Sequence, residues 1–433
     1  MEWFQDQRYG MFIHWGPSVI HGGKYSSSEL SWSRGGNPPD AWCGGGPIPE
    51  PVYDDSFRQF DPKEYNPEQW VQLAKESGMR YMVMTARHHD GFSMFDTHYS
   101  DFKITHPESA YRQRIAKENP DLTDKEIDRK ADVIRQFADA VHAGGLGLGI
   151  YYSEPDWFRE DYRIALTGKN KAGKEVSAAA RQAAKKSYQD FMHAQLEELT
   201  TQYGRVDILW FDAIKPSQVA EHGWQALWIR RDTWDMIRRN QPSMLINDRH
   251  GFEPDYRTPE GSDAQYIPGI VQESCQHLGR QWAWSPDDRA PSLKWVIDRL
   301  IINASRNSNI LMNLGPSPEG VFDAKQADLI RAVGQWLGER GQTFYGTRGG
   351  PVINDGKDPS FVTMHKDGLI FVHVLHSDLG RTEICLPGVK VSKVYLFDHP
   401  EQQIVFRHDS NTAYIRMPEL MDPTDEIFVL EVK

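Results

Sequence analysis

The stretch "GRVDILWFDAIKP", residues 204–216, joins an apolar run to an acidic side chain. Val206 and the apolar residues 208–211 form a run typical of a strand that is buried on both faces. The run ends at Asp212, and a carboxylate at the edge of a core is costly to desolvate unless another group pairs with it or uses it. We therefore expect a core strand that carries an important carboxylate at its carboxyl end.

Strands of this kind alternate with helical segments on both sides of this stretch. The predicted strands lie in residues 11–16, 79–92, 146–153, 205–212, 243–249, 269–275 and 308–316, and the predicted helices in residues 67–78, 131–145, 188–204, 224–240, 292–305 and 323–341. Alternation of apolar strands with helices favours a parallel sheet that is covered on both faces. Seven strands can be counted. An eighth strand, near residues 343–348, is indicated only by a weak apolar pattern.

The pattern changes near Gly346, where short alternating strands follow one another without a helical segment. Turn residues such as Asp367 and Gly368 separate these strands, as in an antiparallel sheet. The predicted fold is α/β: a (β/α)8-like TIM barrel in residues 1–345, followed by a C-terminal antiparallel β-sandwich in residues 346–433. Two charged segments, residues 107–129 and 163–186, interrupt the barrel pattern and are predicted to be solvated insertions.

The composition argues against several kinds of partner. The formal net charge is -12 and the sequence has no basic run with interleaved aromatic residues, so neither nucleic acid nor an anionic membrane is expected. No apolar stretch approaches the roughly 20 residues that cross a bilayer. The three cysteines lack metal-type spacing, and no cofactor is expected. The compartment stays open: a secreted, periplasmic or lysosomal-type location fits if a signal peptide was removed. The oligomeric state stays open as well.

Polar side chains gather where the predicted strands end. In a barrel, the active site lies at the carboxyl ends of the strands. These ends carry His14, His88, His89, Tyr152, Asp212, Asp248 or Arg249, Glu273 and Asn313. One such residue often only caps a loop, but several in register that can bind hydroxyl groups indicate a pocket for a polyol. Tryptophan is abundant, with 14 residues, and its flat ring suits the faces of sugars.

The carboxylic acids in this set are those that glycoside cleavage needs, one to attack the anomeric carbon or guide water and one to protonate the leaving oxygen. Asp212 is the better nucleophile candidate because a strand end holds it rigidly. A loop-anchoring aspartate is the simpler alternative. The pair His88 and His89 also raises a metal site, but adjacent residues on a strand point to opposite faces, so we expect the histidines to bind substrate hydroxyls instead of a metal.

Several longer motifs together resemble the α-L-fucosidases of glycoside hydrolase family 29. They are "RYGMFIHWG", "ARHHDGF", "LGLGIYYS", "VDILWFD", "TPE" with "ESC" and "QWAWS", and "NASRNSNILMNLGPSPEG" with "GQWLGERGQTFYGT", in the family's order over about the first 345 residues. The resemblance implies an exo-acting, retaining hydrolase with a covalent fucosyl-enzyme intermediate and Asp212 as the nucleophile. It also implies sugar contacts from His14, Glu29, His88, His89, Tyr152, Trp210, Arg249 and Trp282.

The resemblance leaves the general acid/base with two candidates. Glu260, in "RTPEG", lies on the loop where many members carry it, and Glu273, in "VQESC", lies at a strand end. We favour Glu260 and expect Glu273 otherwise to orient its neighbours. "QESC" lacks the tryptophan that often precedes this glutamate, and Ala213 stands where glycine is common. The implied substrate is a fucosylated glycan, oligosaccharide or polysaccharide. The alternatives are an inactive fucose-binding module, which would lack one of the carboxylates, and a metal-dependent barrel hydrolase.

Overall fold

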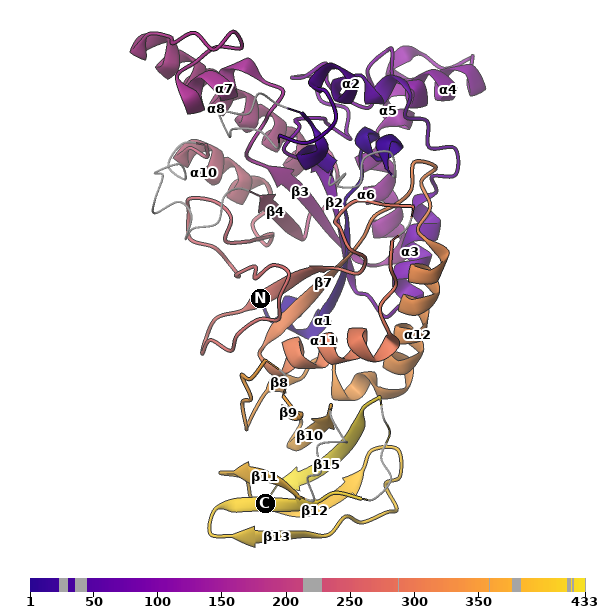
Figure 1. Cartoon of the computed structure of the whole chain (residues 1–433), viewed down its shortest axis with the longest axis vertical. Coiled ribbons are helices and arrows are strands. Elements are labelled where there is room, and N and C mark those ends of the chain that lie inside the picture. The colour runs from indigo at the N-terminus through magenta and orange to yellow at the C-terminus, as the bar shows by residue number, and fades with distance from the viewer. Residues whose placement is uncertain are drawn as a thin grey trace.

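The computed structural model describes the chain apart from residues 23–29, 36–44, 213–227, 287, 358, 376–382, 419–421, 423 and 433. Its larger sheet has seven parallel strands: β1 (Tyr9–Ile13), β2 (Tyr81–Arg87), β3 (Gly147–Ser153), β4 (Ile208–Asp212), β5 (Leu245–Ile246), β6 (Gln272–His277) and β7 (Ser308–Leu314). Their order is β5-β4-β3-β2-β1-β7-β6, and each neighbouring pair is parallel. The barrel-like α/β fold predicted from the sequence is confirmed (Figure 1).

The eighth strand expected near residues 343–348 was predicted wrongly. The 3-10 turn η5 (Gly341–Thr343) occupies its beginning, and β8 (Arg348–Gly349) pairs with β9 (Phe361–Lys366) in the C-terminal sheet. The end strands β5 and β6 are not paired with each other in the described sheet. Instead, the segment that carries Glu260 runs parallel to β6, through a bridge between Glu260 and Cys275.

Helices cover the outside of the sheet. They are α3 (Pro67–Glu76), α6 (Val133–Gly144), α8 (Ala178–Thr201), α10 (Arg231–Asn240), α11 (Leu293–Ser305) and α12 (Ala324–Arg340). Except for α8, which begins ten residues before the predicted start at residue 188, and α10, they lie near the ranges predicted for them. Most of them begin where a side chain accepts a backbone N–H of the first turn: Asn66 caps α3, Ser292 caps α11 and Asp323 caps α12. The helix that corresponds to α10 was predicted from residue 224, and residues 224–227 of that range lie outside the described residues.

Of the remaining helices of the barrel region, α1 directly precedes β1, and the others lie around the carboxyl ends of the strands or in the predicted insertions (Figure 1). The first insertion forms α4 (Ala110–Glu118) and α5 (Asp124–Ala131), and the second contains the end of α7 (Glu160–Thr167) and the start of α8. Short elements complete the set: α1 (Glu2–Gln7), η1 (Pro17–His21), η2 (Leu30–Ser33), α2 (Glu50–Asp54) and η3 (Ser56–Arg58).

Alternate residues of each strand enter two different apolar clusters. In β4, Ile208 and Trp210 pack inside the barrel, whereas Leu209 and Phe211 pack against the helices. In β3, Tyr151 likewise packs inside the barrel, whereas Tyr152 packs against the helices. Because side chains alternate between the faces of a strand, Asp212 follows Trp210 to the inside of the barrel.

The C-terminal region is an all-β unit at the end of the molecule away from β2 and β3 (Figure 1). Its sheets have the orders β12-β15-β10-β9-β8 and β11-β14-β13. The new strands are β10 (Leu369–Val374), β11 (Glu383–Pro387), β12 (Val391–Leu396), β13 (Phe406–Asp409), β14 (Thr412–Arg416) and β15 (Glu426–Val432). Lys294 of α11 donates to the carbonyls of Leu375 and Thr424, which ties this unit to the barrel. The exact boundary at residues 345/346 stays a prediction. None of the described helices has the length and apolar character that crossing a membrane requires.

Candidate functional site

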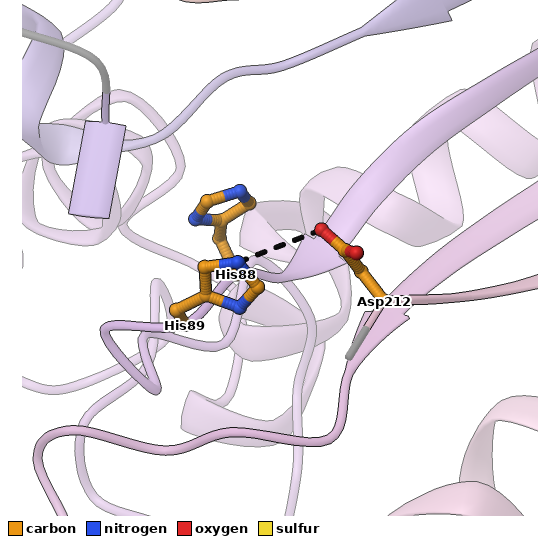
Figure 2. A group of neighbouring side chains, drawn as sticks. All are labelled: His88, His89 and Asp212. Carbon is orange, nitrogen blue, oxygen red and sulfur yellow. Dashed lines mark ion pairs between the residues drawn. The ribbon is translucent and has the colours of Figure 1, made fainter. Parts of the chain in front are cut away.

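Asp212 ends β4 at the carboxyl edge of the barrel, where three side chains surround its carboxylate. The Tyr151 hydroxyl donates to Oδ2 at 2.7 Å, and Nη1 of Arg249 donates to Oδ1 at 2.9 Å. Nε2 of His89 lies 3.5 Å from Oδ2, the pair that Figure 2 marks with a dashed line. Each carboxylate oxygen therefore has a partner that offers a proton or a positive charge.

These partners decide the charge of Asp212. Burial alone would raise the pKa of this carboxyl, but the charge of Arg249, the nearby His89 and the hydrogen bond from Tyr151 outweigh burial and hold the pKa below its ordinary value. Asp212 is thus ionised at neutral pH although it is mostly shielded from water. An ionised carboxylate that is fixed in place is what a nucleophile at a sugar carbon requires.

Arg249 connects Asp212 to a second carboxylate. Its Nη2 donates to Oε2 of Glu260 at 2.9 Å, and its Nε donates to Oγ1 of Thr258 at 3.0 Å. The guanidinium lies over the Trp210 ring, 4.6 Å from the centroid. Glu260 remains open to solvent, with 32% of its side chain exposed. The two carboxylates, with 15% of the Asp212 side chain and 32% of the Glu260 side chain exposed, therefore face each other across a single guanidinium group.

Glu273 occupies a different environment, enclosed in the interior of the barrel. It is fully buried. Its Oε1 accepts from Nε1 of Trp210 at 3.1 Å, and its Oε2 accepts from the Tyr81 hydroxyl at 2.5 Å. Burial raises the pKa of Glu273 to about 7. Glu273 thus supports the underside of the pocket through Trp210, the ring on which Arg249 rests.

Three histidines that the sequence selected lie together beside Asp212. Nδ1 of His14 is 2.7 Å from Oδ1 of Asn313, and Nδ1 of His88 is 2.5 Å from Oγ of Ser31. Burial lowers the pKa of His14 to about 4 and that of His88 well below its ordinary value. Both imidazoles are therefore neutral near pH 7. A neutral imidazole offers one donor and one acceptor, which suits the hydroxyl groups of a sugar.

The structure does not bring every selected residue to this cluster. Tyr152 points to the helix layer, where its hydroxyl donates to Oε1 of Gln195 at 3.0 Å and the Arg87 guanidinium lies over its ring. Its neighbour Tyr151 faces the barrel interior and contacts Asp212 instead. Tyr151 is the parallel partner of Trp210, and both side chains face the barrel interior, whereas Tyr152 faces the opposite side of the strand. This register is the signal that identifies Tyr151.

Glu29, Trp282 and Ser31 complete the residues considered for the wall of the pocket. Glu29 lies outside the described residues. The Trp282 ring is 5.0 Å from that of His14, at the edge of the inner cluster. Ser31 was not selected from the sequence, which offers no motif for it, yet its hydroxyl holds His88.

The cluster of His88, His89 and Asp212 also has the composition of a metal site, because one ligand atom from each lies within 4.8 Å of the others (Figure 2). The expectation that the two histidines point to opposite faces was wrong, because β2 ends at Arg87 and the histidines follow it. Two histidines and a carboxylate are ligands that zinc accepts. However, the Arg249 guanidinium already neutralises Asp212 and would repel a dication. The site therefore fits a neutral polyol better than a metal ion.

Comparisons with known proteins find one family of relatives. Residues 1–342 match the family model described as "Alpha-L-fucosidase". The chain is 22% identical over 431 residues to an α-L-fucosidase of Dictyostelium discoideum, with 90% of this chain and 84% of that protein covered. It is 21% identical over 391 residues to the human tissue α-L-fucosidase, with 86% and 75% covered.

Solved structures of fucosidases share the whole fold. Isoenzyme 1 of α-L-fucosidase from Paenibacillus thiaminolyticus superposes with a TM-score of 0.75 at 27% identity, covering 100% of this chain and 98% of that one. A family 29 α-L-fucosidase from Bacteroides thetaiotaomicron gives a TM-score of 0.78 at 20% identity, covering 100% and 95%. That enzyme was captured as a covalent intermediate with 2-fluoro-fucosyl fluoride.

Proposed function

Because the chain belongs to the α-L-fucosidase family, a family of glycoside hydrolases, we propose that it is an exo-acting, retaining α-L-fucosidase in which Asp212 is the nucleophile and Glu260 the acid/base. One observation carries the proposal: Asp212 and Glu260 accept hydrogen bonds from the same guanidinium, that of Arg249. Two carboxylates with one enclosed and the other open to solvent suit the two roles of a retaining glycosidase.

In the first step, a carboxylate oxygen of Asp212 forms a bond to the anomeric carbon while the bond from that carbon to the leaving oxygen breaks. Glu260 gives its proton to the leaving oxygen. In the second step, Glu260 removes a proton from water, the water oxygen bonds to the anomeric carbon, and Asp212 leaves as a carboxylate. The fixed charge of Arg249 favours the ionised form of Asp212, both before the first step and when Asp212 leaves in the second.

The pocket around Asp212 suits a 6-deoxy sugar. The neutral imidazoles of His14 and His88, with His89, offer hydrogen bonds to the ring hydroxyls. The partly buried ring of Trp282 supplies apolar surface for a methyl group, whereas Trp210 is buried and supports Arg249 from beneath. We include Glu29 as a further sugar contact on the basis of its motif alone. The proposed substrate is a terminal α-L-fucosyl unit on a glycan, an oligosaccharide or a polysaccharide.

Azide rescue tests the choice of the acid/base. In the Glu260→Ala variant, an aryl fucoside with a good leaving group should still form the covalent intermediate, because little protonation is needed. Azide should then restore turnover by replacing the activated water and should yield fucosyl azide of retained configuration. Glu273→Ala should show no rescue, because Glu273 is enclosed by Trp210 and Tyr81. Rescue of Glu273→Ala and not of Glu260→Ala would reverse the assignment.

A metal-dependent hydrolase is the second candidate function, and the cluster of His88, His89 and Asp212 is the observation in its favour. The ion pair between Asp212 and Arg249 weighs against it. Removal of metal ions distinguishes the two candidates, because only a metal-dependent hydrolase would lose its activity.

A further inference from the structure

Trp32 is a large apolar side chain that remains open to solvent beside the catalytic cluster. Its side chain is 49% exposed, although it lies in η2 between the buried residues Ser31 and Ser33. The indole stands edge-on to the His89 ring, with centroids 5.9 Å apart, and to the Trp157 ring, with centroids 5.0 Å apart. We infer that Trp32 is a platform for the sugar unit to which the cleaved fucose is attached. This inference rests on the proposed function.

The backbone around Trp32 is anchored on its amino-terminal side to the histidine segment. Oγ of Ser31 accepts from the backbone N–H of Asp90 at 2.9 Å and contacts Nδ1 of His88. Oγ of Ser33 donates to the carbonyl of Leu30 at 2.6 Å, which closes the short turn. Trp32 is thus carried by a segment that is hydrogen-bonded to the loop of His88 and Asp90.

A buried arginine anchors the other side. Arg34 is almost fully enclosed and pairs with Asp54 at 2.7 Å and with Glu50 at 3.1 Å. Its Nη1 also donates to the carbonyl of Trp157 at 3.2 Å, so Arg34 ties the segment that carries Trp32 to the backbone of Trp157. Fixing an exposed indole in this way removes the entropy cost that a mobile side chain would incur when a ligand binds.

The position of Trp32 relates it to the leaving group. His89 contacts both Trp32 and Asp212, since its Nε2 lies 3.5 Å from the carboxylate and its ring meets the indole. A fucosyl unit held against Asp212 fills the enclosed pocket, so the remainder of the substrate extends over the exposed edge. Trp32 lies on that edge.

The chemistry of the platform favours a neutral sugar. The rings that meet Trp32 are an indole and an imidazole, and burial lowers the pKa of His89. The exposed indole therefore presents an uncharged apolar face. The C–H face of a pyranose ring packs on such a surface, whereas a small leaving group is too short to reach it.

The test compares Trp32→Ala and Trp32→Phe on two kinds of substrate: α-L-fucosyl fluoride and a panel of linkage-defined α-L-fucosyl disaccharides. Trp32→Ala should lower kcat/KM about tenfold for the disaccharide that the wild type cleaves best, the size expected for one lost stacking contact. Trp32→Phe should retain most of the activity, and both variants should stay within about twofold of wild type on the fluoride. Trp3→Ala is the matched control, since Trp3 is 37% exposed and lies beside Gly147, at the other end of the barrel strands.

Three results would overturn the inference. An equal loss on the fluoride would make Trp32 a wall of the fucose pocket. An unchanged rate on every disaccharide would leave the platform without a ligand, as would a wild type that cleaves the fluoride and none of the disaccharides. If the wild type does not cleave the fluoride, the proposed function itself fails, and that outcome is distinct from the other three.

Discussion

Replacing Arg249 by methionine should change the pH dependence of the enzyme as well as its rate. Arg249 donates to Asp212 at 2.9 Å in a nearly enclosed site, and it is the strongest of the groups that keep the pKa of Asp212 low. A hydrogen bond to a charged group is worth about 1.5 to 3 kcal/mol. Losing it should lower kcat/KM roughly 10- to 150-fold, because each 1.36 kcal/mol is a factor of ten.

The same loss raises the pKa of Asp212, since the ionised form loses its main partner. If Asp212 is the nucleophile, as proposed, it must be ionised, so the acidic limb of the kcat/KM profile should move to higher pH. The assay is the pH–rate profile of an aryl fucoside for wild type and Arg249→Met.

Arg238→Met provides the matched control for this prediction. Arg238 also lies 4.6 Å over an indole, that of Trp234, and donates to a carboxylate, Asp255, at 2.8 Å, yet it is outside the cluster around Asp212. Arg238→Met should keep the wild-type acidic limb. If Arg249→Met keeps that limb too, the reasoning about the charge of Asp212 is refuted.

Three further predictions concern single residues and the metal question. Tyr151→Phe should lower kcat/KM by about 10-fold or more because it removes a hydrogen bond to the ionised Asp212, whereas Tyr152→Phe should change it by less than about twofold, and equal losses would contradict the assignment of faces. Burial raises the pKa of Glu273 to about 7, so the folded protein keeps a proton that the unfolded chain loses above about pH 4.5. As the pH rises from about 4.5 to 7, the unfolding free energy of wild type relative to Glu273→Gln, measured by urea titration, should therefore fall by up to about 3 kcal/mol. A difference that stays constant over this range would show that Glu273 is ionised when folded. Prolonged dialysis against a chelator should leave fucoside hydrolysis unchanged, and a loss that zinc reverses would favour the metal-dependent alternative.

The sequence predicted the strands well where their apolar runs are continuous. Residues 205–212 contain β4, and Asp212 lies at its carboxyl end, because a buried strand needs an uninterrupted apolar run and must end where the first costly group appears. The eighth strand failed for the opposite reason. The run near residues 343–348 is short, and its end pairs with the C-terminal sheet, which no local pattern reveals.

Within the site, the sequence could select a strand end but not always the correct face. Tyr151 and Tyr152 are chemically identical neighbours, and only the register with Trp210 decides which of them meets Asp212. Depth was equally hidden: Glu273 was predicted at the carboxyl end of its strand, but that was wrong, because it is the second residue of β6 and lies enclosed under Trp210. The link from Arg249 to both Asp212 and Glu260 joins residues on separate segments, and only the folded chain brings them together.

The most direct test of the central claim is to trap the enzyme with 2-fluoro-fucosyl fluoride, digest it and locate the modified peptide by mass spectrometry. The electron-withdrawing fluorine slows both steps, and the good leaving group lets the covalent intermediate accumulate when its hydrolysis is slower still. We predict one fucosyl label per chain, attached to Asp212, and no label in Asp212→Ala. A label on another carboxylate, or steady hydrolysis of fucosides by Asp212→Ala, would contradict the account.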